Sequence, residues 1–304
     1  MISRRSINNF IWIDLVSPSE SEVREVADEY KLEYFTARDL SSPTPKPRVR
    51  AYESGKYICA VLHIPAFKHS HIGDAPQEID IIIGRNVLIT ARYESIDAFN
   101  TFEKESDVQN ILGKTNSEYK NIALHLLQEI QNCLFDEIAF IEDWVGFIED
   151  GIFSGKQKGM VTEISQVSKN ILNFKKTLKP QRDILIFLNE EGGKRFGKLF
   201  EEGTKDLIKS WERLDESIAN NFEMLLELRA TNDSILSTGQ NEVMKTLTIL
   251  AFVTFPLSLI AAVFGMNASS MPIVGGPHDF WMILGIMFTA TLSMFVYFKY
   301  KKWI

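Results

Sequence analysis

The tripeptide Gly265-Met266-Asn267 lies near the C-terminus. It contains a glycine, a residue type that often ends a helix, and an asparagine, which carries an amide side chain. They directly follow an uncharged run from Thr246 to Phe264, and a second uncharged run extends from Phe280 to Phe298. Each run is about 19 residues long, close to the ~20 residues with which a helix crosses the ~30 Å hydrocarbon core of a bilayer. Asn267 is therefore expected where a spanning helix leaves the membrane, and an amide at a pore mouth can meet a cation.

The amide of Asn267 suits a cation that keeps its hydration shell. Mg²⁺ sheds water reluctantly and retains several waters when it is bound. A ring of amides can hold the hydrated ion through these waters, whereas a ring of carboxylates would bind it more tightly. We therefore expect Gly265, Met266 and Asn267 to form a selectivity filter, which points towards ion transport.

The segment before the tripeptide predicts a helix with two unlike faces. One face is mostly small or polar, at positions three or four residues apart: Asn241, Met244, Thr248, Ala251, Phe255, Ser258, Ala262 and Gly265. The other face is bulky and apolar: Leu250, Val253, Leu257, Ile260 and Phe264. A membrane helix with a polar stripe faces protein or water. Close helix–helix packing explains small residues as well as a pore does, so this periodicity alone leaves both alternatives open.

The same register continues towards the N-terminus and favours the pore. It passes through Ser237, Ser234, Ala230, Glu227, Glu223, Asn220 and Glu216. The opposite side of this helix is expected to be apolar, with Trp211, Leu214, Ile218, Leu225 and Leu228. A polar, partly acidic face of this kind suits a cation vestibule. Since two helices per chain cannot enclose a pore, we expect a homo-oligomer in which Met244 and Leu247 form hydrophobic gating rings.

Nothing in the sequence predicts an enzyme or a nucleic-acid-binding protein. The chain has 304 residues and a net charge of −7, which argues against nucleic acid as a partner. No phosphate-binding loop, nucleophile motif or pair of catalytic carboxylates stands out. Cys59 and Cys133 need no disulfide. The histidines His63, His69 and His71 lack further ligands at the spacing of a structural zinc site, and His69-Ser70-His71 is expected on the surface.

Basic residues predict the orientation in the membrane. Lys245 flanks the first spanning helix, and Lys299, Lys301 and Lys302 follow the second, whereas the linker 265–279 has neither Lys nor Arg. By the positive-inside rule, both termini lie in the cytoplasm and the linker lies outside. We therefore expect a multi-pass protein of the plasma membrane or the bacterial inner membrane, without a signal peptide.

The sequence predicts three regions. They are an α/β cytosolic domain over residues 1–115, a cytosolic helical stalk region over 116–240, and a membrane domain over 241–304 with helices at about 244–264 and 280–298. In the first region, we expect a strand from Phe10 to Leu15, a helix from Ser17 to Tyr30 that Ser17 and Glu20 cap, and a hairpin turn at Gly84-Arg85-Asn86.

Apolar residues three or four apart from Ile122 to Val145 predict a long helix in the second region, beginning at about Glu118. We expect helix breaks at Gly151 to Gly159, at Pro180 and at Gly192-Gly193, and a last helix from about Thr204 into the membrane.

The C-terminal third resembles the CorA family of magnesium and cobalt transporters. The likeness rests on Asn241 to Lys245, Pro256, Phe264 to Asn267, Met271-Pro272 and the ending Lys301 to Ile304, and Trp12 to Leu15 and Pro47 to Val49 also look family-like. The resemblance implies a funnel-shaped homopentamer with an α/β cytosolic domain, long stalk helices and two C-terminal transmembrane helices. It also implies passive Mg²⁺ influx, driven by the membrane potential, through a pore lined by residues of the polar stripe.

The resemblance further implies regulatory Mg²⁺ bound between subunits, with Asp206 and Asp97 as the matching carboxylates. Two departures from the family pattern blur the metal preference: Ile273 follows Met271-Pro272, and Phe255 stands where Met is common. Co²⁺, Ni²⁺ or Zn²⁺ therefore stay open as further ions. A zinc transporter of the same superfamily and a non-conducting, membrane-anchored metal sensor or scaffold are the alternatives.

Overall fold

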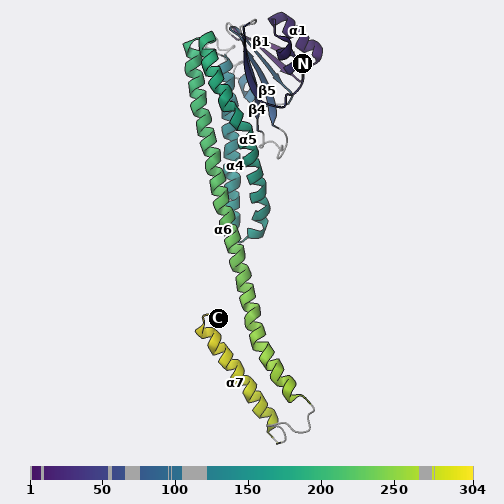
Figure 1. Ribbon diagram of the computed structural model, residues 1–304, viewed down its shortest axis with the longest axis vertical. Coiled ribbons are helices and arrows are strands. Elements are labelled where there is room, and N and C mark those ends of the chain that lie inside the picture. The colour runs from purple at the N-terminus through teal and green to yellow at the C-terminus, as the bar shows by residue number, and fades with distance from the viewer. Residues whose placement is uncertain are drawn as a thin grey trace. The chain divides into compact units, whose positions relative to one another are not determined.

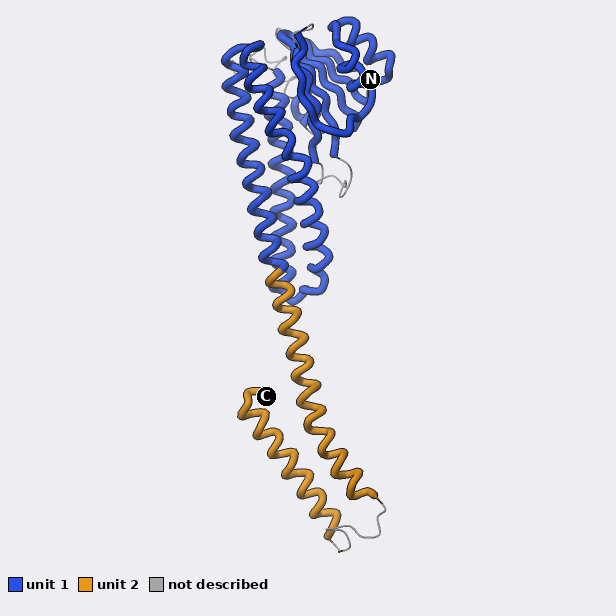
Figure 2. Tube along the Cα trace, in the orientation of Figure 1, with its two compact units in different colours: residues 1–229 blue, residues 230–304 orange. Residues whose placement is uncertain are grey.

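The computed structural model describes residues 2–7, 10–53, 57–65, 76–94, 96, 98–104, 122–266, 276 and 278–303. Two compact units divide the chain, Met1–Arg229 and Ala230–Ile304 (Figure 2). One long helix, α6 (Lys198–Phe264), contributes residues to both units.

A six-stranded sheet forms the N-terminal part of the first unit. Its strands are β1 (Ile2–Ile7), β2 (Phe10–Val16), β3 (Arg48–Tyr52), β4 (Tyr57–Ile64), β5 (Gln77–Ile83) and β6 (Val87–Arg92). Their order is β1-β2-β6-β5-β4-β3, and only β2 and β6 pair in parallel, with Trp12 opposite Leu88. The predicted hairpin is confirmed, because β5 and β6 pair antiparallel and the Gly84 N–H donates to the Val87 carbonyl at 2.8 Å.

Both faces of this sheet are covered by helices, so its central strands are apolar on both sides. One face packs Ile13, Leu15 and Ile89 against Val23 and Val26 of α1 (Glu20–Tyr30). The short helix α2 (Tyr34–Asp39) follows α1. The other face belongs to the same core as the long helices (Figure 1). Successive residues of a strand point to opposite faces, which explains why the two cores alternate along β2.

Three long helices complete the first unit. Helices α4 (Ile122–Phe153), α5 (Gln157–Phe196) and the first part of α6 lie side by side (Figure 1). The apolar residues of α6 that the spacing places on one face are buried: Trp211, Leu214, Ile218, Leu225 and Leu228. The polar residues of the opposite stripe, Glu216, Asn220, Glu223 and Glu227, are exposed. The predicted division of α6 into two faces is therefore confirmed over this part.

The predicted start of the first helix is wrong by about one half-turn. Helix α1 begins at Glu20, and Ser19 with Glu22 forms the capping box instead of Ser17 with Glu20. Ser17 adopts a positive φ of 43°, and its N–H donates to the Arg92 carbonyl at 2.8 Å. The backbone of Ser17 therefore still follows the sheet, which delays the helix.

The predicted breaks at Pro180 and Gly192-Gly193 are also wrong, because α5 continues through both. Leu178 and Ile184 on either side of Pro180 are buried, so tertiary packing offsets the lost backbone hydrogen bond. Gly192 stays helical against the ring of Phe200, where an added Cβ would lie only 2.2 Å from Cε1. The turn into α6 is made by Gly197, whose φ is 95°. Helix α6 thus begins at Lys198 rather than near Thr204.

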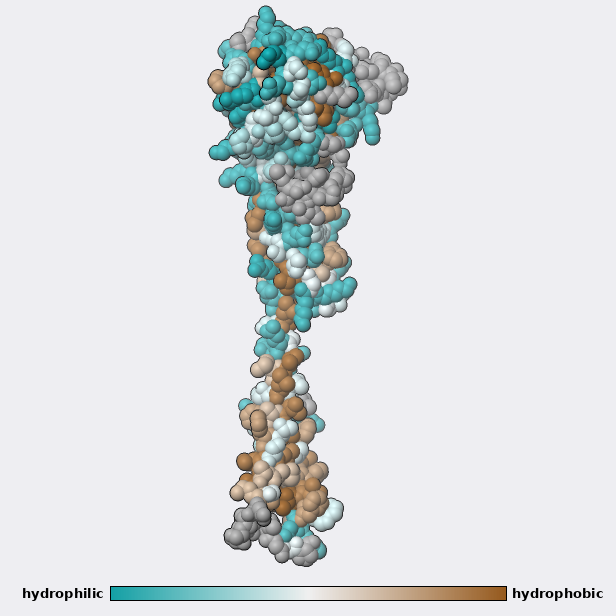
Figure 3. All heavy atoms as spheres, turned by 90° about the vertical axis from the view of Figure 1, so that its right-hand side faces the viewer, coloured by the Kyte–Doolittle hydropathy of each residue, from teal (hydrophilic) through white to brown (hydrophobic). Residues whose placement is uncertain are grey.

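The second unit contains the end of α6 and the helix α7 (Asp279–Tyr300). Within the described chain, these are the two helices that are long and apolar enough to cross a membrane. Many of their large apolar side chains are exposed in the single chain, as the brown surface in Figure 3 shows. Such a large apolar surface requires lipid or protein around it.

Candidate ion pathway

The membrane half of α6 has one side that is partly buried in the single chain and one side that is mostly exposed. Val253, Leu257, Ile260 and Phe264 are partly buried, as are Ile283, Met287, Ala290 and Met294 of α7, and Phe298 is fully buried. These residues recur three or four apart on each helix, the spacing of two packed helices. The bulky stripe expected from the sequence is therefore the partly buried side of α6, except for Leu250, which is exposed.

The small and polar stripe lies on the opposite side of α6. Asn241, Met244, Phe255, Ser258, Ala262 and Gly265 are exposed, and Thr248 and Ala251 are partly buried. Phe255 and Met244 retain 75% and 61% of their accessible surface, and Leu247 beside the stripe retains 54%. The exposure of these residues in the single chain leaves them available to line a shared lumen or to contact a second copy.

One polar side chain of this stripe, that of Thr248, is hydrogen-bonded to the helix itself. The Thr248 hydroxyl donates to the Met244 carbonyl at 2.7 Å, which leaves its oxygen lone pairs free to accept from water. Pro256 lies inside the helix and has no N–H for the Phe252 carbonyl. A carbonyl without its helical partner is tolerated at membrane depth beside protein or water.

Helix α6 ends where the tripeptide begins. The Gly265 N–H donates to the Ala261 carbonyl at 2.9 Å, and the Met266 N–H donates to the Val263 carbonyl at 3.3 Å. A Cβ on Gly265 would lie 2.9 Å from the Ala261 carbonyl oxygen, so the close final turn favours glycine. Asn267 lies outside the described residues, and its role in a filter stays a prediction.

Of the two predicted regulatory carboxylates, the described chain includes only Asp206. Asp206 is exposed on α6, and its Oδ1 lies 2.9 Å from Lys209 Nζ. Asp97 lies outside the described residues. Over the described ranges, no group of three or more His, Cys, Asp and Glu side chains is placed to hold a metal ion. A metal at Asp206 would therefore need ligands from elsewhere, such as a second copy of the chain.

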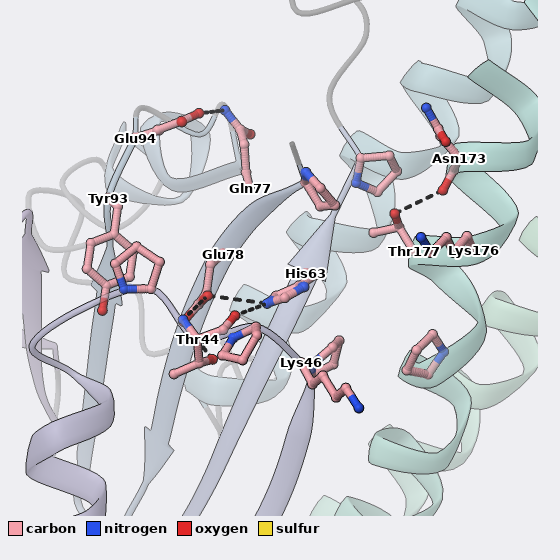
Figure 4. Close-up of a pocket in the computed structure, with 16 residues that line it drawn as sticks. Thr44, Lys46, His63, Gln77, Glu78, Tyr93, Glu94, Asn173, Lys176 and Thr177 are labelled. Atoms are coloured by element: carbon pink, nitrogen blue, oxygen red, sulfur yellow. Dashed lines mark hydrogen bonds and ion pairs between the residues drawn. The ribbon is translucent and has the colours of Figure 1, made fainter. Parts of the chain in front are cut away.

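A cleft of about 850 Å³ lies in the first unit, between the sheet and α5 (Figure 4). His63 Nε2 lies 3.1 Å from the Thr44 carbonyl oxygen and 3.2 Å from Glu78 Oε2. Glu78 also accepts from the Thr44 N–H at 2.7 Å. These contacts give His63 a structural role at the cleft, whereas His69 and His71 lie outside the described residues.

A buried network explains the family-like residues of β2. Arg92 donates from Nη2 to Asp14 Oδ2 at 3.0 Å, and the Thr90 hydroxyl donates to Asp14 Oδ1 at 2.6 Å. The Trp12 indole N–H in turn donates to the Thr90 hydroxyl at 3.0 Å. These contacts join the two parallel strands of the sheet, so the residues are structural.

Asp80 on β5 is a second buried carboxylate, and the sequence did not single it out. Its Oδ2 accepts from the Tyr93 hydroxyl at 3.4 Å, while its Oδ1 has no hydrogen-bond partner among the described residues. Burial, with smaller contributions from Glu78 and Asp39, raises the pKa of Asp80 well above its ordinary value.

Comparisons with known proteins extend over the whole chain. A family model described as "CorA-like Mg2+ transporter protein" matches residues 8–302. The cobalt/magnesium transport protein CorA of Thermotoga maritima is 23% identical over 96% of this chain and 83% of its own length. The magnesium transport protein CorA of Mannheimia succiniciproducens is 26% identical over 98% of this chain and 93% of its own.

Solved structures show the same fold. The complete structure of the CorA magnesium transporter of Methanocaldococcus jannaschii has a TM-score of 0.83 at 22% identity, and the match covers 97% of this chain and 92% of that one. The cytoplasmic domain of ZntB from Vibrio parahaemolyticus has a TM-score of 0.54 at 10% identity, covering 76% of this chain and 90% of that one. The predicted α/β domain, long helices and two C-terminal apolar helices are thus confirmed.

Proposed function

Since the chain belongs to the CorA family of ion transporters, we propose that it forms a homopentameric channel that conducts Mg²⁺. The family match over residues 8–302 carries this proposal, because it includes both apolar helices and the tripeptide between them. Proteins of this family are membrane transporters rather than enzymes. The names of the similar transporters add Co²⁺ as a second candidate ion.

The two faces of α6 support a pore made by several copies. One side of the membrane half is partly buried in the single chain, and the small and polar side is mostly exposed. Five such sides around an axis enclose a lumen whose wall is Asn241, Met244, Leu247, Thr248, Ala251, Phe255, Ser258 and Ala262. Met244 and Leu247 act as the hydrophobic gate, and Gly265, Met266 and Asn267 select hydrated Mg²⁺ at the mouth.

Regulation is the next part of the proposal. Asp206 and Asp97 of neighbouring subunits bind cytosolic Mg²⁺, which joins the subunits and favours the closed state. The exposure of Asp206 supports this role, since its carboxylate is accessible to an ion and to a second copy. Both termini lie in the cytoplasm, at the side where Lys299, Lys301 and Lys302 follow α7.

Ion flux into liposomes that contain the purified protein tests the proposal. We expect Mg²⁺ entry, weaker or comparable Co²⁺ and Ni²⁺ entry, and a pentamer by cross-linking or native mass spectrometry. If the folded pentamer passes no divalent ion, the transport function is rejected, and the alternative of a non-conducting metal sensor or scaffold is favoured. Zn²⁺ uptake that requires a pH gradient would instead identify a proton-coupled zinc transporter.

A further inference from the structure

The second unit contains a cavity that the ion pathway does not use. It has a volume of about 450 Å³ and is lined by Phe252 of α6 and by Ala290, Ser293, Met294, Tyr297, Phe298, Lys301 and Trp303. This volume falls in the range of ~300–1,000 Å³ that small-ligand sites occupy.

The C-terminal turn builds one wall of this cavity. Lys302 adopts a positive φ of 55°, and the Trp303 N–H donates to the Phe298 carbonyl at 2.9 Å. The Trp303 ring stacks on the buried Phe298 ring, with 5.9 Å between centroids and 12° between planes. The chain therefore turns back after α7 and holds Trp303 against the helix.

The lining changes from apolar to polar along the cavity. Phe252, Ala290 and Met294 offer only apolar surface, whereas Tyr297, Lys301 and Trp303 add a hydroxyl, an ammonium and an indole N–H. Aromatic residues of this kind gather where a membrane meets water. Over the part of the chain that the structure describes, the Lys301 ammonium has no ion-pair partner. A ligand with an apolar tail and an anionic head would match both ends.

We propose that this cavity binds one acidic phospholipid of the membrane surface at which α7 ends. Its acyl chain lies against Phe252, Ala290 and Met294, and its phosphate accepts hydrogen bonds from Lys301 and Trp303. One turn of helix with its side chains is ~11 Å wide and ~5.4 Å high, so it occupies about 500 Å³. This is more than the cavity volume of about 450 Å³. A second copy's helix would therefore cover the cavity rather than enter it. The proposal rests on membrane insertion of α6 and α7, and it is independent of conduction and of Mg²⁺ regulation.

Quenching of Trp303 fluorescence by brominated lipids tests the site in the full-length protein. Trp281→Phe removes the other tryptophan of the second unit. One set of vesicles contains brominated phosphatidylglycerol in unlabelled phosphatidylcholine, and the other contains the reverse labelling at the same bromine content. We expect acidic lipid to be preferred near Trp303 by about fivefold, the factor that corresponds to ~1 kcal/mol per basic residue at an anionic surface.

Two variants and one control separate a built site from general surface charge. Lys301→Gln should remove the preference, and Ala290→Phe should reduce it by filling the apolar end. Lys299→Gln removes the same charge from a residue outside the cavity and should leave the preference largely intact. Equal quenching by both lipids in the unchanged protein would overturn the proposal, as expected if a second copy covers the cavity. The proposal would also be overturned if Lys301→Gln and Lys299→Gln reduced the preference for acidic lipid equally, or if inorganic phosphate abolished that preference.

Discussion

The ion pair between Lys209 and Asp206 allows a sharp test of the proposed regulation. Lys209 Nζ lies 2.9 Å from Asp206 Oδ1, and the two side chains are 71% and 76% exposed. A divalent ion that binds Asp206 must displace this lysine. Exposed pairs contribute only ~0.2–1 kcal/mol, because solvent screens them. Lys209→Gln should therefore strengthen Mg²⁺ binding at Asp206 by about 1.4-fold to fivefold.

The assay is Mg²⁺ influx into proteoliposomes at increasing Mg²⁺ on the side of the soluble unit. In Lys209→Gln, the Mg²⁺ concentration that halves the flux should fall by that factor. Lys198→Gln is the matched control, because Lys198 pairs with Glu202 at 3.8 Å. It lies ~12 Å along the helix from Asp206, beyond the ~8 Å Debye length at physiological salt. An unchanged or raised half-inhibitory concentration in Lys209→Gln, or an equal fall in the control, would refute Asp206 as a regulatory ligand.

Three further predictions concern stability, measured as thermal or denaturant unfolding of the purified protein. Arg92→Met should destabilise it by about 3–5 kcal/mol, because Asp14 then stays buried without its ionic partner. Gly192→Ala should destabilise it by about 1–3 kcal/mol, because the new Cβ would overlap the buried ring of Phe200. The raised pKa of Asp80 means that the folded state holds a proton which the unfolded state releases near pH 4, so stability should fall as pH rises above about 4. Asp80→Asn should remove that part of the pH dependence.

Each of these predictions has a result that would contradict it. Gly146 has no atom within 4 Å of an added Cβ, so Gly146→Ala should be neutral or slightly stabilising. Equal effects at Gly146 and Gly192 would refute the steric argument. A stability change below about 1 kcal/mol in Arg92→Met would show that the buried pair is replaceable. An identical pH profile in Asp80→Asn would show that this carboxylate is not protonated in the folded state.

Periodicity in the sequence predicted the elements whose faces differ most. The spacing of Trp211, Leu214 and Ile218 placed the packed side of α6 correctly. The turn signal at Gly84-Arg85-Asn86 likewise predicted the hairpin that β5 and β6 form. Such patterns are strong because burial in a core acts on every turn or every second residue.

Local sequence signals gave wrong predictions where tertiary packing determines whether a helix continues. Pro180 and Gly192 disfavour a helix on their own, yet α5 continues because its buried face packs against α4 and α6. Ser17 and Ser19 can each cap the first helix. Which of them does so depends on how far the pairing of β2 continues along the chain, and the local sequence does not determine that.

The sequence could indicate the side of α6 that would line a pore, but not the lipid cavity. The polar stripe repeats along one helix, so its spacing is visible in the printed residues. The cavity depends on the positive φ of Lys302 and on the stacking of Trp303 on Phe298. A contact between a chain end and a helix leaves no periodic pattern in sequence.

Mg²⁺ uptake driven by an imposed membrane potential tests the central claim most directly. At 100 mV, inside negative, the potential is worth ~2.3 kcal/mol per charge, so passive flow should concentrate a divalent ion on the order of 10³-fold. We predict such uptake without a pH gradient, and its loss in Asn267→Ala with the pentamer intact. A folded pentamer that shows no potential-driven Mg²⁺ uptake, or normal uptake in Asn267→Ala, would contradict the proposed pathway through Gly265-Met266-Asn267.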